Sequence, residues 1–139
     1  MKHLRYIKRR INDILWGSDL IASRFFLALA SLMWAFLLFW PGDTFTRPTY
    51  TLMGKFGGEW TWAFLFLIQG GLALYSLLYK SRNRILLIGD GVLGCFLWTG
   101  SCVAMLLSVY PPPAAISAEI IAAFMSWWIL VRYPVDLEK

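Results

Sequence analysis

The chain has 139 residues, of which 59% are hydrophobic and 15% are charged, and its net charge is +5. Because a soluble domain usually has about 25% charged and 45–50% apolar residues, this composition argues against a water-soluble globular protein. Six of the 13 basic residues lie within the first 24 positions, where they suit anionic headgroups and membrane orientation better than nucleic acid.

The first segment, 1–17, is basic and has apolar residues at helical spacing along one face. This pattern predicts an amphipathic helix lying in the membrane surface, and a flank that only sets orientation is the alternative. An uncleaved anchor is favoured over a signal peptide, because the apolar run that follows continues to Trp40. The residues expected at the membrane surface are Lys2, Arg5, Lys8, Arg9, Arg10 and Trp16.

Four apolar blocks follow, and each is long enough for a membrane-spanning helix. They cover residues 20–41, 60–79, 85–109 and 114–132, and a short tail, 133–139, ends the chain. The predicted fold class is therefore all-α. We expect a single membrane domain, 1–139, with four transmembrane helices and an N-terminal interfacial helix.

The longest connection, 42–59, contains four glycines and several aromatic residues. A loop of this length is usually functional or disordered, and the aromatic content argues against disorder. We therefore expect an interfacial or partly re-entrant segment on the outer side. The aromatic residues expected in the outer interface are Trp40, Trp60, Trp62 and Tyr110.

The distribution of basic residues predicts the orientation. The N-terminal segment up to Arg24, the turn 80–84 and the end of the chain hold eleven of them, whereas the opposite side holds Arg47 and Lys55. Because cytoplasmic loops carry the excess of Lys and Arg, both termini are expected in the cytoplasm, in a bacterial-type inner membrane.

Asp90 is the one charge in the third span and lies between two glycines. With Gly94 the segment spells G-x-G-x-x-G, but it lacks the preceding strand and the later acidic residue that a dinucleotide site needs. Glycines in a spanning helix instead allow a neighbouring helix to approach. A buried carboxylate needs a partner, and Arg24 lies at a similar depth in the first span. We predict an Arg24–Asp90 pair, with Arg84 as the alternative cation.

Helical spacing places the small and polar residues of each span on one face. The stripes are Arg24, Ala28, Ser31 and Ala35; Gln69, Ala73 and Ser76; Asp90, Gly94, Ser101 and Ser108; and Ala115, Glu119, Ala122, Ala123 and Ser126. Small residues at helix contacts indicate the interior of a bundle. A path for water, protons or ions along part of these stripes is the alternative. The intramembrane residues singled out for polar or packing roles are Arg24, Gln69, Asp90, Gly94, Ser101, Glu119 and Ser126.

Glu119 is the second buried acid, near the outer end of the fourth span. Glu119 and Asp90 lie in opposite leaflets, on the order of 15 Å apart along the membrane normal, so a paired-carboxylate site is not expected. Only the loop residues Lys55 and Arg47 are candidate partners for Glu119. The open alternatives are that it is protonated, faces water or meets another subunit, and the last favours oligomerisation.

A catalytic constellation, a metal cluster and a cofactor motif are not recognisable, so an enzyme is not expected. Cys95 and Cys102 are interpreted as apolar fillers. The predicted function is that of a subunit, scaffold or modulator of a membrane complex, acting through helix–helix association. The alternative is a homo-oligomeric, holin-like pore or small ion or proton pathway that uses Glu119 and Asp90. The expected partners are anionic lipids and either further copies of the chain or another membrane protein.

Overall fold

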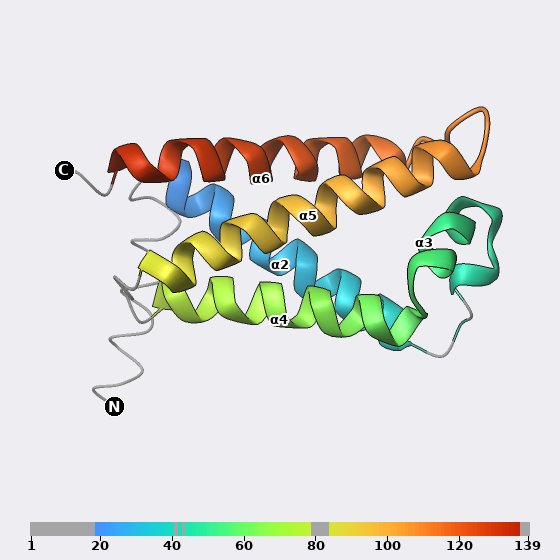
Figure 1. Ribbon diagram of the computed structural model, residues 1–139, viewed down its shortest axis with the longest axis horizontal. Helices are drawn as coiled ribbons and strands as arrows, with labels where there is room; N and C mark the ends of the chain where they lie inside the picture. Colours follow the sequence, from blue (N-terminus) through green and yellow to red (C-terminus); the bar gives the residue numbers. More distant parts are fainter. Residues whose placement is uncertain (1–18, 41, 43, 79–83, 137–139) are drawn as a thin grey trace.

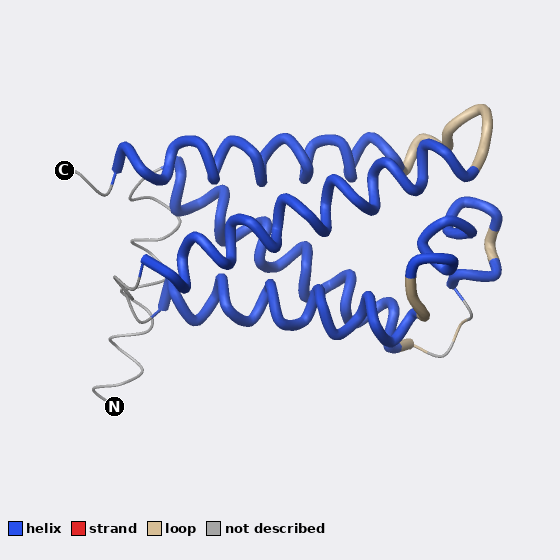
Figure 2. Tube along the Cα trace, viewed as in Figure 1, coloured by secondary structure: helices blue, strands red, loops and turns tan. Residues whose placement is uncertain are grey.

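The computed structural model describes residues 19–40, 42, 44–78 and 84–136. The long helices are α2 (Asp19–Phe39), α4 (Glu59–Leu78), α5 (Arg84–Ser108) and α6 (Ile116–Asp136). Between α2 and α4 lie two 3-10 helices, η1 (Thr44–Thr46) and η2 (Pro48–Tyr50), and the short helix α3 (Thr51–Phe56). The described chain is therefore all-α, as predicted, with five α-helices and two short 3-10 helices (Figure 2).

Three of these helices, α2, α4 and α5, are long and apolar enough to cross a membrane, which indicates an integral membrane protein. Their bounds lie within two residues of the predicted apolar blocks. The fourth block forms a shorter apolar helix, Ile116–Val131. α6 itself continues to Asp136, so the first residues of the predicted tail are helical.

The predicted surface helix, 1–17, lies outside the described residues. The same holds for its proposed membrane contacts, which are Lys2, Arg5, Lys8, Arg9, Arg10 and Trp16.

The long helices form two antiparallel hairpins, one of α2 with α4 and the other of α5 with α6 (Figure 1). Glycines allow close approach within each hairpin. A Cβ atom at Gly70 would lie 2.8 Å from Cγ of Leu32 and 3.0 Å from the carbonyl oxygen of Ala28. A Cβ atom at Gly91 would lie 3.0 Å from Cδ1 of Leu130. The expected packing role of the glycines beside Asp90 therefore holds for Gly91.

Residues 44–56 form a folded cap at one end of the bundle, the end that also holds the turn between α5 and α6 (Figure 1). This outer cap packs on α5, where the Leu52 N–H donates to Oγ of Ser108 at 3.3 Å. Met53, within the cap, is buried, and its carbonyl oxygen accepts a hydrogen bond from the indole of Trp62 at 3.1 Å. The cap therefore buries the ring of Trp62 against the start of α4, and the interfacial depth of this residue stays a prediction.

Each long helix turns its small and polar stripe inward and many of its bulky residues outward, although Phe66, Leu97 and Trp98 are buried. The stripe residues that are buried are Arg24, Ala28, Ser31, Ala35, Gln69, Ala73, Ser76, Asp90, Gly94, Ser101, Glu119, Ala122 and Ser126. Ser108 and Ala123 are half-buried, and Ala115 is exposed because it precedes the first residue of α6. Large apolar side chains such as Phe26, Met33 and Phe96 cover the outside, as lipid contact requires.

Candidate functional site

Hydrogen bonds between polar side chains are concentrated where the two hairpins meet. We call this set of residues the polar seam; it consists of Arg24, Ser31, Trp34, Gln69, Asp90, Trp98 and Glu119. Four bonds join one hairpin to the other: Arg24–Asp90, Trp34–Glu119, Gln69–Asp90 and Ser31–Trp98. Side-chain bonds within the hairpins link Arg24 with Ser76, Ser101 with Glu119, and Trp127 with Thr99. In an apolar surrounding, such bonds fix the relative position of the helices.

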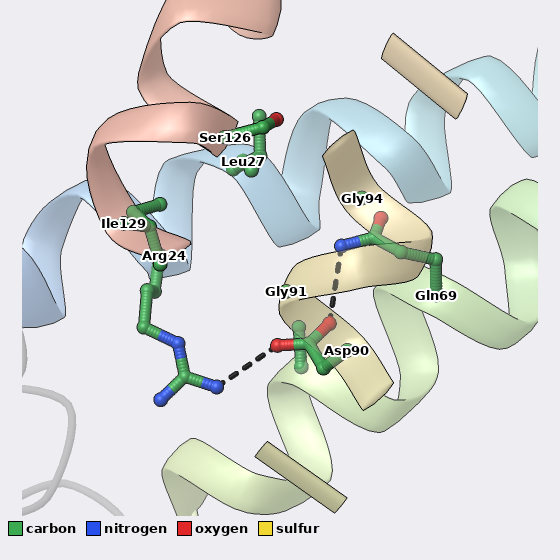
Figure 3. A pocket seen from close by; sticks show the side chains of 9 residues that line it. Arg24, Leu27, Gln69, Asp90, Gly91, Gly94, Ser126 and Ile129 are labelled. Atoms are coloured by element: carbon green, nitrogen blue, oxygen red, sulfur yellow. Dashed lines mark hydrogen bonds and ion pairs between the residues drawn. The ribbon is translucent and has the colours of Figure 1, made fainter. Parts of the chain in front are cut away.

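At the end of the bundle opposite the outer cap, the seam is an ion pair. Nη2 of Arg24 lies 2.9 Å from Oδ2 of Asp90, and the two residues are only 7% and 5% exposed (Figure 3). The Arg24 guanidinium also donates to Oγ of Ser76 on α4, at 3.0 Å. The predicted ion pair between Arg24 and Asp90 is therefore present. Arg24 connects α2 to α5 through this pair and to α4 through Ser76.

Gln69 of α4 completes this cluster. Its amide nitrogen donates to Oδ1 of Asp90 at 3.2 Å, while its amide oxygen, which is buried, has no hydrogen-bond partner among the described residues (Figure 3). The side chain lies against the Cα of Gly94, where an added Cβ would come within 3.3 Å of the amide nitrogen. Gly94 therefore has a spatial role, since even alanine here would require Gln69 to shift by a few tenths of an ångström.

A small cavity of about 10 Å³ adjoins this cluster, between both hairpins. Its lining includes Arg24, Gln69, Asp90 and Ser126. A cavity at this limit admits at most about one water molecule. The space between the hairpins at this level is thus nearly closed, and the charged groups there are directed at one another.

At the end of the bundle near the outer cap, the seam is built around Glu119, which is 4% exposed. Its Oε1 accepts a hydrogen bond from the indole N–H of Trp34 at 2.7 Å, and its Oε2 lies 3.2 Å from Oγ of Ser101. The expectation that only Lys55 or Arg47 could serve Glu119 is therefore wrong. Its partners come from helices α2 and α5, because α6 crosses both of them at this depth.

Tyr50 of the outer cap covers this end of the seam. Its ring meets that of Trp34 edge-on, with centroids 5.9 Å apart. Burial, and to a lesser extent the negative charge of Glu119, raise the pKa of the Tyr50 phenol above its ordinary value of 10.0, while Arg47 opposes the shift. The phenol is therefore a titratable group of the outer cap whose pKa depends on Glu119.

The interior serines chiefly donate hydrogen bonds to backbone carbonyl oxygens of their own helices. The hydroxyls of Ser31, Ser101 and Ser126 lie within 3.0 Å of the carbonyl oxygen four residues earlier. This back-bonding leaves little donor capacity for a ligand. Cys95 and Cys102 are buried and free, and no cluster of three or more His, Cys, Asp or Glu that could hold a metal ion occurs in the described parts of the chain.

The structure brings Arg24, Gln69, Asp90 and Gly94 together in one cluster and Ser101 with Glu119 in another. Ser126 lines the cavity without a side-chain bond to either acid in the described residues. Sequence reasoning missed the two tryptophans of the seam. Both have a signal in retrospect, because each lies in mid-span, away from the interface, and on the same helical face as the small stripe.

The Trp98 indole donates to Oγ of Ser31 at 3.2 Å, which adds a bond between α5 and α2 halfway along the seam. The seam thus consists of three separate groups of interhelical bonds, with one acid balanced by arginine and the other bonded to uncharged groups.

In comparisons with known proteins, no family model, no curated protein and no solved structure matches this chain.

Proposed function

We propose that this protein is a non-enzymatic integral membrane protein that works by helix–helix association, as a subunit, scaffold or modulator of a membrane complex. In this proposal α6 is a fourth membrane-crossing helix, and both termini lie on the cytoplasmic side of a bacterial-type inner membrane. The surface of α6 carries the proposal, because it combines an exposed apolar face with a short apolar length.

The exposed face of α6 runs along one side of the helix at three- and four-residue spacing. Its members are Ile121, Phe124, Trp128 and Val131. Phe124 is 73% exposed, the largest value among the large hydrophobic residues of α6 whose exposure is described, those up to Val131. Aromatic side chains of this kind supply much of the energy of protein contacts, because they offer large area with few rotatable bonds.

The apolar part of α6, Ile116–Val131, spans about 24 Å at about 1.5 Å per residue. The hydrocarbon core of a bilayer is about 30 Å thick. A helix that is too short for the bilayer is accommodated by thinning the lipid or by associating with other helices. Association with a partner helix would relieve the mismatch and cover the face around Phe124.

The interior of the molecule favours this function over the alternative of a pore. Asp90 is paired with Arg24, and Glu119 is bonded to Trp34 and Ser101 within the same chain. A conducting path needs polar groups that face water, whereas these are directed at one another. The polar stripes thus support packing within the chain, and the outer apolar surface is what remains for partners.

The test is native mass measurement of protein extracted from its own membrane in mild detergent. We expect a defined complex heavier than the single 16.0 kDa chain. Phe124→Ala should weaken that complex by about fivefold or more, the effect of losing about 1 kcal/mol at a contact. Phe96→Ala, at a residue on α5 that is 65% exposed, is the matched control and should leave the complex unchanged.

A single chain at all protein concentrations, or equal effects of the two substitutions, would contradict the proposal. Ion and proton flux into liposomes gives the second arm. Flux above that of empty vesicles that disappears in Glu119→Gln would favour the pore instead.

A further inference from the structure

We propose that Glu119 is a proton-binding site, and that its neutral carboxyl group latches α6 to α2 and α5. The bound ligand is a proton taken from the aqueous side next to the outer cap. This inference is independent of the proposed function, since it concerns a group inside one chain. Three observations carry it: the surroundings of Glu119, the hydrogen count at Ser101 and the contrast with Asp90.

The surroundings of Glu119 are uncharged. The side chains bonded to it are neutral, namely the indole of Trp34 on α2 and the hydroxyl of Ser101 on α5. The titratable groups whose pKa is affected by its charge, the thiol of Cys102 and the phenol of Tyr50, carry no positive charge either. Among the described residues, no Lys, Arg or His lies within ion-pair distance of the carboxyl group. An isolated buried carboxylate is so costly that such a group is usually neutralised by a proton.

The hydrogen count at Ser101 points the same way. A hydroxyl group has one hydrogen to donate. Oγ of Ser101 lies 2.7 Å from the carbonyl oxygen of Leu97, on its own helix, and 3.2 Å from Oε2 of Glu119. If the shorter contact takes the serine hydrogen, the longer one needs a hydrogen on Oε2. A protonated Glu119 supplies it, and Oε1 remains free to accept from Trp34 at 2.7 Å.

Asp90 is the internal contrast. It is buried to the same extent as Glu119, but an arginine lies 2.9 Å away and the Gln69 amide donates to its other oxygen. Asp90 is therefore neutralised by a cation, whereas at Glu119 the geometry favours neutralisation by a bound proton. The N-terminal turn of α6 favours a negative charge, but the oxygens of Glu119 reach across to α2 and α5 instead.

Release of the proton has a structural consequence. The proton passes to water beside the outer cap, and the negative charge stays on Glu119, between α2, α5 and α6. The Ser101 contact then loses its hydrogen, and the charge has to reach water or a cation. We therefore expect rising pH to loosen α6 from α2, first at the end near the cap. In the same range, ionised Glu119 would oppose ionisation of Tyr50.

The test uses infrared spectroscopy of the full chain in lipid, with ¹³C-labelled glutamate to separate glutamate from aspartate signals. At neutral pH we expect a protonated carboxyl band that disappears in Glu119→Gln and remains in Glu59→Gln. Raising the pH should convert this band to carboxylate. The absence of a protonated glutamate band at neutral pH would overturn the proposal.

A stability measurement gives an independent readout. Glutamine resembles a neutral carboxyl group, so Glu119→Gln should unfold at the same denaturant concentration as the wild type, whereas Asp90→Asn should unfold earlier. Equal losses for both variants would overturn the proposal. If Glu119→Gln does not fold, the double variant Glu59→Gln/Glu138→Gln leaves Glu119 as the single glutamate of the chain and permits the infrared test directly.

Discussion

Asp90→Asn is the sharpest perturbation of the polar seam, because asparagine keeps the shape of the side chain and removes its charge. Arg24, 7% exposed, then loses the charge of Asp90 that lies 2.9 Å away, while its bond to the Ser76 hydroxyl stays. In soluble proteins, removing one partner of a buried ion pair costs about 3–5 kcal/mol. The cost is smaller in a membrane, since polar groups on separated helices still find partners and arginine near a helix end can reach the interface. We therefore expect a loss of about 2 kcal/mol in the free energy of unfolding.

The assay is reversible unfolding in mixed micelles, followed by helicity, for Asp90→Leu, Arg24→Met and the double variant, beside Asp90→Asn. Replacing both partners by apolar residues removes the uncompensated charge. The double variant should thus be more stable than the two single losses predict, by at least about 1 kcal/mol, within the range for residues in contact. Losses that add to within about 0.5 kcal/mol would show that Arg24 and Asp90 do not depend on each other, and the reasoning about the ion pair would be refuted.

Two further predictions concern the packing of α4 and the outer cap. Gly70→Ala places a Cβ atom against Leu32 and the backbone of α2, so it should lower the free energy of unfolding by about 1–3 kcal/mol. Its neighbour Gly71 has no atom within 4 Å of an added Cβ, so Gly71→Ala should change the stability by at most about 1 kcal/mol; similar effects of both substitutions in the same unfolding assay would argue against the close contact of α2 with α4. The folded-state pKa of Tyr50 lies above its ordinary value of 10.0. The contribution of Tyr50 to the free energy of unfolding is therefore present below pH 10 and is lost as the pH rises through the folded-state pKa. Phenolate absorbance should therefore show one late-titrating tyrosine that is missing from Tyr50→Phe, and an unchanged titration in that variant would contradict the burial of the phenol.

The position of the helices follows directly from the order of the residues. Apolar blocks of about twenty residues have few alternatives to helix in a membrane, since every backbone group must be satisfied internally. The ion pair was predictable for a similar reason. Arg24 and Asp90 lie at equal depth on small-residue faces, and a charge buried in such a helix has to find its opposite.

The partners of Glu119 could not be predicted from helical spacing and depth along its own helix. Trp34 lies 85 positions away from Glu119, and their contact depends on where α6 crosses α2. Hydropathy gives the depth of a residue along its own helix, but it gives neither the crossing point nor the rotation of a second helix. The contacts of the outer cap could not be inferred from spacing either. The burial of Trp62 depends on a chain reversal at Gly57 and Gly58 that brings the Met53 carbonyl oxygen to the indole N–H.

The amino-acid sequence by itself determined that this is an all-α membrane protein, which face of each long helix is turned inward, and that Arg24 and Asp90 pair. Periodicity and the cost of burying a charge act within one helix or at one depth, so they can be inferred from spacing. Only the tertiary structure decided that the helices form two hairpins joined by a polar seam, and that Glu119 meets Trp34 and Ser101 instead of a cation. Those contacts depend on how the hairpins cross, which is the summed result of packing over all four long helices.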